Sequence, residues 1–299
     1  MNESLTRPLK SLLRIALHTA ALPFRPVAPR VLIYHSVDEH GSPISISPDL
    51  FARQMDWLVA KGYTTWTASR FATALRQRQK IPRRVVVLTF DDGYLNNITT
   101  ALPILEQRGL CATMFMVTEN DGDVPRWGER DKERIAAMVD ALFPGNEADK
   151  ARATESVHAT LTERIATWDE LRGAPERGFE ILSHTRTHPY MDAVDDAQLR
   201  DELVGSKRDL EERGFGPCNA IAWPYGMHDD RAIAAAAEAG YEGTYLGEYF
   251  WHLRHHPDPM RICRIGADPS RGVFGLAFVL GRGYDWLQWL RRLKPRREY

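Results

Sequence analysis

The sequence has no long hydrophobic run, few cysteines and almost no net charge. No stretch of about 18 apolar residues occurs in it, so no membrane-spanning helix is predicted. Its three cysteines, Cys111, Cys218 and Cys263, include no C-x-x-C pair, and this odd, scattered set excludes a disulfide framework. A net charge of −1 leaves no basic footprint for a nucleic acid, so we expect no nucleic-acid partner.

Both ends of the chain are nevertheless basic. Residues 1–30 carry five Lys/Arg against one Glu, and residues 282–299 carry six against Asp285 and Glu298, so each end has a net charge of +4. With Leu, Phe or Trp on one helical face, both ends predict peripheral contact with an anionic membrane surface, and solvated terminal helices are the equal alternative. Because the first segment lacks a clean signal-peptide cleavage site, we expect a cytoplasmic protein, peripheral at the inner membrane, in preference to a secreted one.

Short apolar segments alternate with helical patterns along the middle of the chain. The predicted strands are 31–34, 85–90, 112–117, 179–182, 220–223 and 261–265, and the predicted helices are 48–61, 97–108, 196–213 and 229–239. This alternation predicts an α/β fold with a parallel sheet and outer helices. About seven such units favour a closed or nearly closed β/α barrel, with an open doubly wound sheet as the alternative.

The sequence divides into three parts. Residues 1–30 form a basic N-terminal segment, residues 31–270 form the main domain, and residues 271–299 form a basic C-terminal segment. Within the domain, the charged stretch at about 119–165 predicts an inserted helical segment.

Polar side chains follow several of the predicted strands at the point where each strand ends. In a parallel α/β sheet, functional side chains gather at this edge. The residues that we expect to meet there are His35, Asp91, Asp92, His184, His188 and the Pro-Tyr-Gly turn at 224–226.

The two histidines and the two aspartates suit a metal ion. His184 and His188 are four residues apart, so on one helical turn both rings would face the same way. Two histidines and one carboxylate, Asp92 or Asp91, make a three-ligand site for a divalent cation with positions left for water. The other aspartate can then stay ionised as a base. A surface histidine pair and an incidental aspartate pair are the alternative.

Three of these segments resemble the motifs of a known family. T-F-D-D-G at 89–93, S-H-T-R-T-H at 183–188 and W-P-Y-G at 223–226 are similar to the first three motifs of the polysaccharide deacetylases, the NodB-homology family. T-W-D-E-L at 167–171 is a further match. The resemblance extends over about residues 30–270 apart from the insertion.

The resemblance implies a fold and a set of roles. The implied fold is a distorted, NodB-like β/α barrel. It implies a divalent metal, usually zinc, held by Asp92, His184 and His188. Asp91 would be the general base, and the backbone N–H of Tyr225 would bind the oxyanion.

Two positions depart from the family pattern. Ala222 stands where many members have an arginine that orients the catalytic aspartate, and no L-x-H motif with its acid histidine lies near the C-terminus. I-Y-H at 33–35 resembles that last motif moved to the front, as in the circularly permuted biofilm poly-N-acetylglucosamine deacetylases. We therefore predict His35 as the general acid, although a packed core histidine is the alternative. The other candidates for the acid are His228, His252, His255 and His256.

The implied activity is metal-dependent hydrolysis of N-acetyl groups on an amino-sugar polysaccharide or a lipid-linked glycan precursor. Trp223, Tyr225 and Trp251 are candidates for stacking on sugar rings. Three alternatives stay open: an amidohydrolase for a formamido sugar or small amide, a non-catalytic glycan-binding module, and an Fe(II) oxygenase with the same ligand types. The alternation of strands and helices opposes the oxygenase, and no particular oligomeric state is predicted.

Overall fold

The computed structural model describes residues 29–133, 136–137, 139, 147–247, 258–266, 272–281 and 284. Most of the two basic end segments, 1–30 and 271–299, therefore lies outside the described residues.

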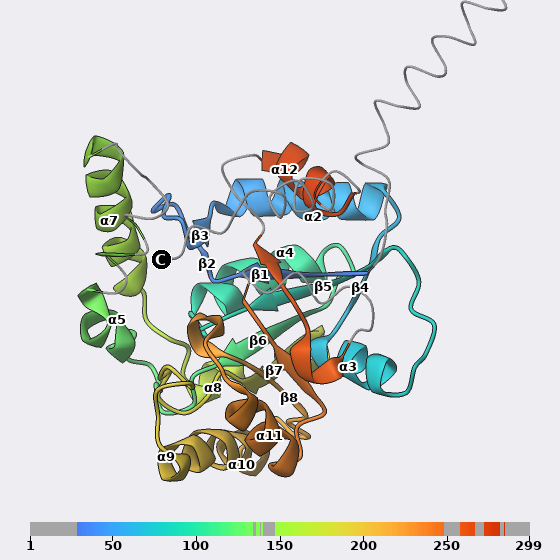
Figure 1. Ribbon diagram of the computed structural model, residues 1–299. Helices are drawn as coiled ribbons and strands as arrows, with labels where there is room; N and C mark the ends of the chain where they lie inside the picture. The colour runs from blue at the N-terminus through green and yellow to red at the C-terminus, as the bar shows by residue number, and fades with distance from the viewer. Residues whose placement is uncertain are drawn as a thin grey trace, which may run out of the picture.

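A curled parallel sheet forms the centre of the molecule (Figure 1). In pairing order its strands are β10 (Ile265–Gly266), β1 (Arg30–Tyr34), β5 (Val85–Phe90), β6 (Ala112–Met116), β7 (Phe179–Ser183), β8 (Ala220–Ala222) and β9 (Gly243–Tyr245), and β4 (Thr64–Trp66) pairs with β5 off this path. The two edges of the sheet meet through one segment, because Ile262 forms a parallel bridge to Tyr245 while β10 pairs with β1. This arrangement confirms the distorted barrel and not the open sheet.

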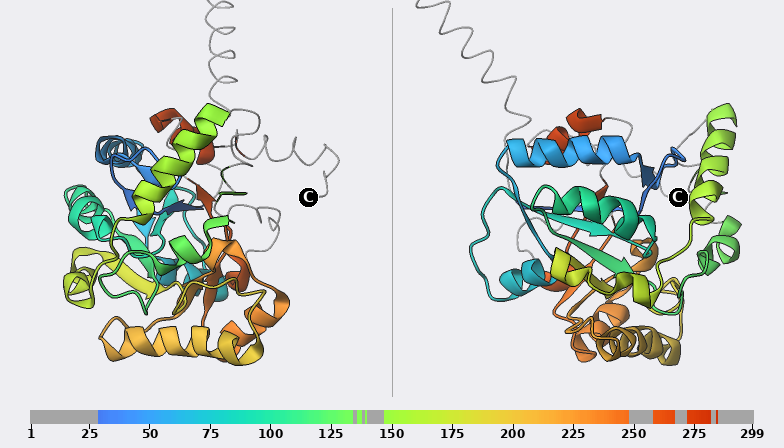
Figure 2. Two further views of the ribbon diagram at one scale, coloured as in Figure 1. Left: turned by 90° about the vertical axis from the view of Figure 1, so that its left-hand side faces the viewer. Right: turned by 180° about the vertical axis from the view of Figure 1, so that it is seen from behind.

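Helices cover the outside of this barrel (Figures 1 and 2). They are α2 (Pro48–Ala60), α3 (Ala68–Arg76), α4 (Leu102–Glu106), α8 (Trp168–Leu171), α9 (Asp196–Arg200), α10 (Ser206–Glu212), α11 (Asp230–Glu238) and α12 (Gly272–Val279). The π-helical turn η2 (Asn97–Ala101) leads into α4, and η4 (Asp201–Gly205) joins α9 to α10. The short elements are β2 (Ser36–Val37), β3 (Ser45–Ile46), η3 (Pro175–Arg177), η5 (Pro224–Gly226) and η7 (Pro259–Arg261).

The first of these helices begins where its sequence predicts. The Ser47 side chain accepts a hydrogen bond from the backbone N–H of Leu50 at 3.3 Å, and Pro48 takes the first helical position. The hydroxyl replaces a partner that the first turn of a helix lacks, and proline has no N–H to leave unpaired there.

An aromatic cluster supports the end of β5, where the site begins. All six residues of β5 are buried. The ring of Phe90 lies 5.4 Å from Tyr34, 5.7 Å from Phe51 and 5.5 Å from Phe179, centroid to centroid. Burying one such side chain contributes about 1.5–3 kcal/mol. The next residue, Asp91, therefore follows a strand end that is fixed by close packing.

The inserted segment is helical, as predicted. It contains α5 (Arg126–Arg130) and α7 (Glu147–Leu161). Figures 1 and 2 show both helices beyond the carboxyl ends of the central strands, on the side of the barrel where the site lies. A small apolar cluster of Val139, Ala153 and Val157 packs within this segment, apart from the main core.

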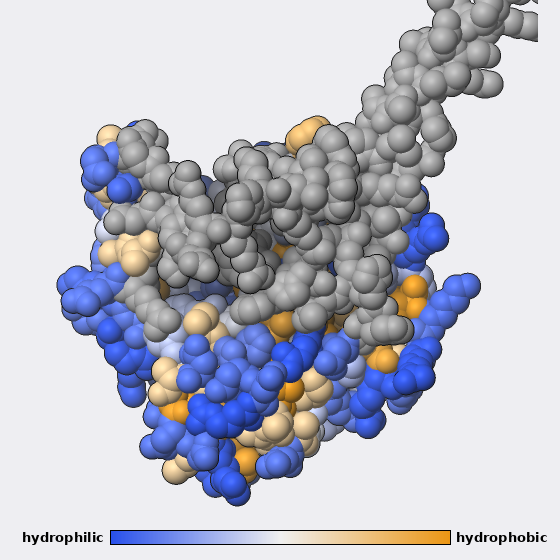
Figure 3. Space-filling model, in the orientation of Figure 1, coloured by the Kyte–Doolittle hydropathy of each residue, from blue (hydrophilic) through white to orange (hydrophobic). Residues whose placement is uncertain are grey.

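Among the described residues, few large apolar side chains are exposed, the most exposed being Phe274. On the face drawn in Figure 3, the part formed by described residues is mainly hydrophilic, with scattered apolar residues. Among the described helices, none combines the length and the apolar character needed to cross a bilayer.

Candidate active site

Asp91 and Asp92 lie in a tight turn that directly follows β5. The N–H of Asp91 donates to the carbonyl of Tyr34 at 3.0 Å, which continues the pairing of β5 with β1 by one residue. Asp92 has φ 73° and Gly93 has φ 93°, so the chain reverses in the left-handed region. A Cβ on Gly93 would lie 3.2 Å from the Met116 side chain, so this position needs glycine. The turn buries both carboxylates.

His184 and His188 converge, although not on a helix. Thr185 and His188 have φ 68° and φ 59°, so the predicted helical turn at 184–188 is wrong. The segment is a loop after β7 that folds back on itself. Its two imidazole rings still meet, with centroids 4.9 Å apart at 71°.

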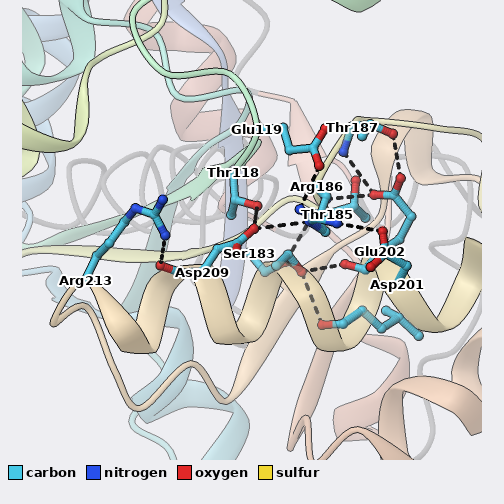
Figure 4. Close-up of polar contacts among 12 residues, drawn as sticks. Thr118, Glu119, Ser183, Thr185, Arg186, Thr187, Asp201, Glu202, Asp209 and Arg213 are labelled. Carbon is cyan, nitrogen blue, oxygen red and sulfur yellow. Dashed lines mark hydrogen bonds and ion pairs between the residues drawn. The ribbon is translucent and has the colours of Figure 1, made fainter.

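A buried glutamate of η4 fixes the loop that carries the two histidines (Figure 4). Glu202 is 1% exposed. Its Oε2 accepts hydrogen bonds from the backbone N–H groups of Arg186 at 2.7 Å and Thr187 at 3.0 Å, and its Oε1 accepts from the Thr187 hydroxyl at 2.5 Å. One side chain of η4 therefore fixes two of the three residues between the histidine pair.

Arg186 anchors the same loop through its side chain (Figure 4). Its guanidinium pairs with Glu119 and Asp201, each at 2.7 Å, and with Asp209 at 3.2 Å. A Cβ on Gly205 would lie 2.3 Å from the Arg186 side chain, so only glycine fits at this position of η4, where the arginine crosses the helix. No pattern in the sequence indicates this scaffold, because its partners are neither neighbours in the chain nor part of a known spacing.

Asp92, His184 and His188 form a candidate metal centre. Their ligand atoms all lie within 4.8 Å of one another, and all three residues are buried. Oδ1 of Asp92 is 3.6 Å from Nε2 of His184 and 3.3 Å from Nε2 of His188. Nδ1 of His184 bonds the carbonyl of Ala222 at 2.8 Å, so Nδ1 carries the proton and Nε2 presents its lone pair to the cluster.

The protonation states fit a cation. Burial lowers the pKa of His184 to about 4. Burial alone would raise the pKa of Asp92, but the hydrogen bond and charge of His188 outweigh it and lower that pKa to about 2. Nδ1 of His188 is buried and has no hydrogen-bond partner among the described residues. A neutral imidazole nitrogen and an ionised carboxylate facing each other are the groups that a divalent cation binds.

Asp91 is tied to a buried arginine that the sequence analysis missed. Arg264, which is 1% exposed, holds Asp91 through two parallel bonds, Nη1 to Oδ1 at 2.5 Å and Nη2 to Oδ2 at 2.7 Å. Its Nε donates to the carbonyl of Leu246 at 2.9 Å, and Nη1 also donates to the Thr89 hydroxyl at 3.3 Å. Arg264 directly precedes β10, so closure of the barrel places it beside β5. It therefore supplies the charge that the family arginine would bring from position 222.

The arginine also decides the charge of Asp91. Burial would raise the pKa of this carboxyl, but the Arg264 guanidinium, with a smaller contribution from His184, more than offsets it and the pKa is lowered. Asp91 therefore stays ionised at neutral pH with its Oδ2 only 3.7 Å from Nε2 of His184. This geometry suits a general base beside the candidate metal centre.

Tyr225 forms the opposite wall of the site. Its backbone is left-handed, with φ 56° and ψ 6°. The hydrogen bonds that close this turn run from the N–H groups of Gly226 and Met227. Among the described residues, none of the hydrogen bonds found for the turn uses the N–H of Tyr225, which leaves it available to a ligand. The Tyr225 ring lies edge-on to His188, with centroids 4.6 Å apart.

The remaining histidines and tryptophans that the sequence suggested for the site lie near it, in the core, or outside the described residues. His35 is half-buried and directly follows Tyr34, whose register partner in β5 is Phe90, so it leaves the sheet at the same edge as Asp91. His228 stacks on Trp223 with centroids 5.9 Å apart, but Trp223 itself is fully buried, so it is core and does not stack on a sugar. Trp251, His252, His255 and His256 lie outside the described residues.

A parallel α/β barrel with an Asp-His-His cluster and a second buried carboxylate at its carboxyl edge is typical of metal-assisted hydrolases. The sequence profile of one such family, described as polysaccharide deacetylase, matches residues 78–244. The protein therefore belongs to the polysaccharide deacetylase family. This match confirms the family resemblance of the three motifs.

Individual curated proteins that are similar to this chain are also deacetylases by name. YxkH of Bacillus subtilis (strain 168) is 25% identical over 218 residues, covering 73% of this chain and 64% of its own length. The poly-beta-1,6-N-acetyl-D-glucosamine N-deacetylase of Escherichia coli (strain K12) is 24% identical over 270 residues, covering 82% of this chain but 38% of its own length. The chain thus spans less than two thirds of either relative.

Solved structures show the same fold. The Streptococcus pyogenes deacetylase PplD, in complex with acetate, has a TM-score of 0.64 at 20% identity, with 84% of this chain and 97% of that chain covered. IcaB from Ammonifex degensii has a TM-score of 0.63 at 19% identity, with 85% of this chain and 97% of that chain covered.

Proposed function

We propose that the protein hydrolyses the N-acetyl group of amino sugars in a glycan, with a divalent cation, in the first place zinc, held by Asp92, His184 and His188. The observation that carries this proposal is the buried Asp-His-His cluster directly beside the Arg264–Asp91 pair. It is supported by family membership and by the Escherichia coli relative, whose name gives poly-beta-1,6-N-acetyl-D-glucosamine as its substrate.

In this mechanism each group of the chain has one task. Asp91 accepts the proton of the attacking water, and Arg264 keeps Asp91 ionised and aimed at the site. The N–H of Tyr225 donates to the acetyl oxygen as negative charge develops on it. When bound, a divalent cation supplies Lewis-acid polarisation of the acetyl carbonyl and makes water easier to deprotonate. The water oxygen bonds to the acyl carbon, the C–N bond breaks, and acetate and a free amine leave.

The amine is a poor leaving group unless it is protonated, and we assign that step to His35. The register of β1 and β5 supports this assignment, because Tyr34 pairs with Phe90 and His35 and Asp91 therefore follow their strands at the same edge of the barrel. Among the described residues, His228 is the alternative candidate for the general acid, since its Nδ1 lies 2.9 Å from the carbonyl of Gly226 in the Tyr225 turn.

Acetate release from N-acetylglucosamine oligomers tests the activity. We expect purified protein to release acetate with added zinc or cobalt, to lose the activity on chelation, and to regain it when metal returns. No release from fully metallated protein would overturn the N-acetyl assignment. Formate release from a formamido sugar, or glycan binding without turnover, would then identify which of the two alternative functions holds.

His35→Ala is expected to lower kcat by about 100-fold or more while the bound metal stays near one ion per chain, because general-acid catalysis contributes about 10²–10⁴ in rate. The measurement is turnover beside metal content, with His228→Ala as the matched variant. Full activity in His35→Ala together with loss in His228→Ala would transfer the acid role to His228.

The glycan and the location of the protein are further parts of the proposal. The net charge of +4 at each end supports an enzyme that acts beside an anionic membrane on a lipid-linked precursor, in the cytoplasm. Cell fractionation tests this, and recovery of the protein free in the periplasm or the medium would overturn it.

A further inference from the structure

The inserted segment reaches into the site with three neighbouring side chains. The Trp127 ring stacks on His188, with centroids 4.5 Å apart at 21°. The Arg130 guanidinium donates to the carbonyls of Thr187, at 3.0 Å, and of His188. The Tyr225 hydroxyl donates to Oδ2 of Asp131 at 2.6 Å. One short stretch of chain therefore touches both the histidine loop and the Tyr225 turn.

Trp127 and Asp131 are the buried members of this group, with Trp127 3% exposed and the Asp131 side chain 8% exposed, while the Arg130 side chain is 44% exposed. Arg130 pairs with both oxygens of Asp131, Nε to Oδ1 at 3.1 Å and Nη2 to Oδ2 at 2.8 Å. Because both oxygens are occupied by Arg130 and Tyr225, Asp131 has little capacity left for a sugar hydroxyl. Its geometry is that of a residue that holds its neighbours in place.

The backbone conformation of Tyr225 depends on contacts that fix its side chain. A side chain at φ 56° is in a disfavoured backbone region, which persists only when the surroundings determine it. The direction of the Tyr225 N–H depends on this conformation. The ring is fixed on three sides, by Asp131 at the hydroxyl, by Tyr190 stacked at 4.4 Å, and by the edge contact with His188.

The inserted segment is itself fixed to the aspartate turn. The N–H of Ala166, at its end, donates to the carbonyl of Gly93 at 2.9 Å, and the N–H of Ile165 donates to the carbonyl of Asp123 at 2.8 Å. A Cβ on Gly128 of α5 would meet the Leu161 side chain at 3.4 Å, so α5 packs directly on the end of α7. The segment is therefore a supported wall of the site.

We propose that Asp131, together with Arg130, is a positioning residue that couples the histidine loop to the Tyr225 turn, so that the inserted segment completes the active site. The inference rests on the proposed function in one respect, the role of the Tyr225 N–H as donor to the acetyl oxygen. The positioning itself is a property of the chain and does not depend on the substrate.

A double-mutant cycle tests the coupling. We expect Asp131→Asn and Tyr225→Phe each to lower kcat for acetate release by about 10-fold to 100-fold, with KM changed much less, because each weakens a hydrogen bond to a charged group. Since both act through one bond, the double variant should be no slower than the slower single variant. Glu129→Gln removes the same charge from an 84%-exposed side chain of α5 and should behave as wild type.

Amide hydrogen exchange provides the readout that does not need a substrate. In Asp131→Asn, exchange should rise in the peptides that cover residues 186–190 and 223–227, while it stays at the wild-type rate in Glu129→Gln and in the other sheet segments. Unchanged exchange and unchanged kcat in Asp131→Asn would overturn the proposal, as would losses that add fully in the double variant. Increased exchange in Asp131→Asn, together with a wild type that releases no acetate, would keep the positioning role and refute the deacetylase assignment alone.

Discussion

Replacing Arg264 by methionine is expected to abolish most of the activity and to lower the free energy of unfolding by about 3–5 kcal/mol, because it leaves the Asp91 carboxylate buried without its partner. Both side chains are almost fully inaccessible to water, at 1% and 3% exposure, so solvent cannot replace the lost bonds. Acetate release and urea unfolding of the same preparations measure the two effects.

The companion variants separate folding from chemistry. Asp91→Asn should be inactive and less stable, since it leaves a buried guanidinium unpaired. The double variant, Asp91→Asn with Arg264→Met, should recover much of the lost stability and none of the activity. Arg261→Met is the matched control, because Arg261 pairs with Asp230 at the surface and such a pair contributes about 1 kcal/mol or less. If Arg264→Met keeps wild-type stability and turnover, the arginine does not orient the base.

The same pair sets a pH dependence with a defined sign. The pKa of Asp91 is lower in the folded than in the unfolded protein, so its contribution to stability is present above the unfolded pKa and is lost as the pH falls through the folded pKa. In Arg264→Met, burial is opposed only by weaker charges, so the pKa rises relative to wild type. The difference in unfolding free energy between wild type and variant should therefore grow from acid to neutral pH, as urea unfolding at several pH values will show.

Loss of a metal ligand has the second large expected effect. Asp92→Ala, His184→Ala or His188→Ala should weaken zinc or cobalt binding by more than about 100-fold, since even residues that only support a ligand change affinity by about 10–100-fold. Turnover should fall with it. Titration of the d–d absorption of cobalt measures the affinity.

Thermal unfolding checks the same site without a substrate. Zinc at 100 times its dissociation constant should stabilise the wild type by about 2.7 kcal/mol, through preferential binding to the folded state. The three ligand variants should show no such gain. His158→Ala, at an exposed position of α7, should respond to zinc like wild type. An equal zinc response in the ligand variants would place the metal elsewhere.

The elements that could be predicted from the sequence are those with a local pattern. The strand ends at Asp91, His184 and Tyr225 follow apolar runs, and α2 begins at a serine cap and a proline, so their positions are encoded within a few residues. The four-residue spacing of His184 and His188 predicted correctly that the two rings meet, but the helical turn on which the prediction rested does not form. The pair converges through two left-handed residues, Thr185 and His188, while Glu202 holds the two residues between these, and no periodicity indicates such a loop.

Neither Arg264 nor Asp131 has a local pattern. Arg264 meets Asp91 across 173 residues, and Tyr225 meets Asp131 across 94. A short polar stretch such as R-I-C-R-I is compatible with many environments, so its side chains acquire a role only when a distant segment packs against them. The match to the family profile, residues 78–244, likewise contains neither His35 nor Arg264.

By itself, then, the sequence determined the class of fold, the family and the six residues proposed for the site, because alternating strands and helices and short motifs depend on neighbouring residues. The tertiary structure decided how Asp91 is held. Closure of the barrel brings the segment before β10 between β9 and β1, and this places a buried arginine beside Asp91, where Ala222 supplies no charge. It also decided that the inserted segment is part of the site, since Asp131 reaches Tyr225 only after both have folded over the carboxyl edge of the sheet.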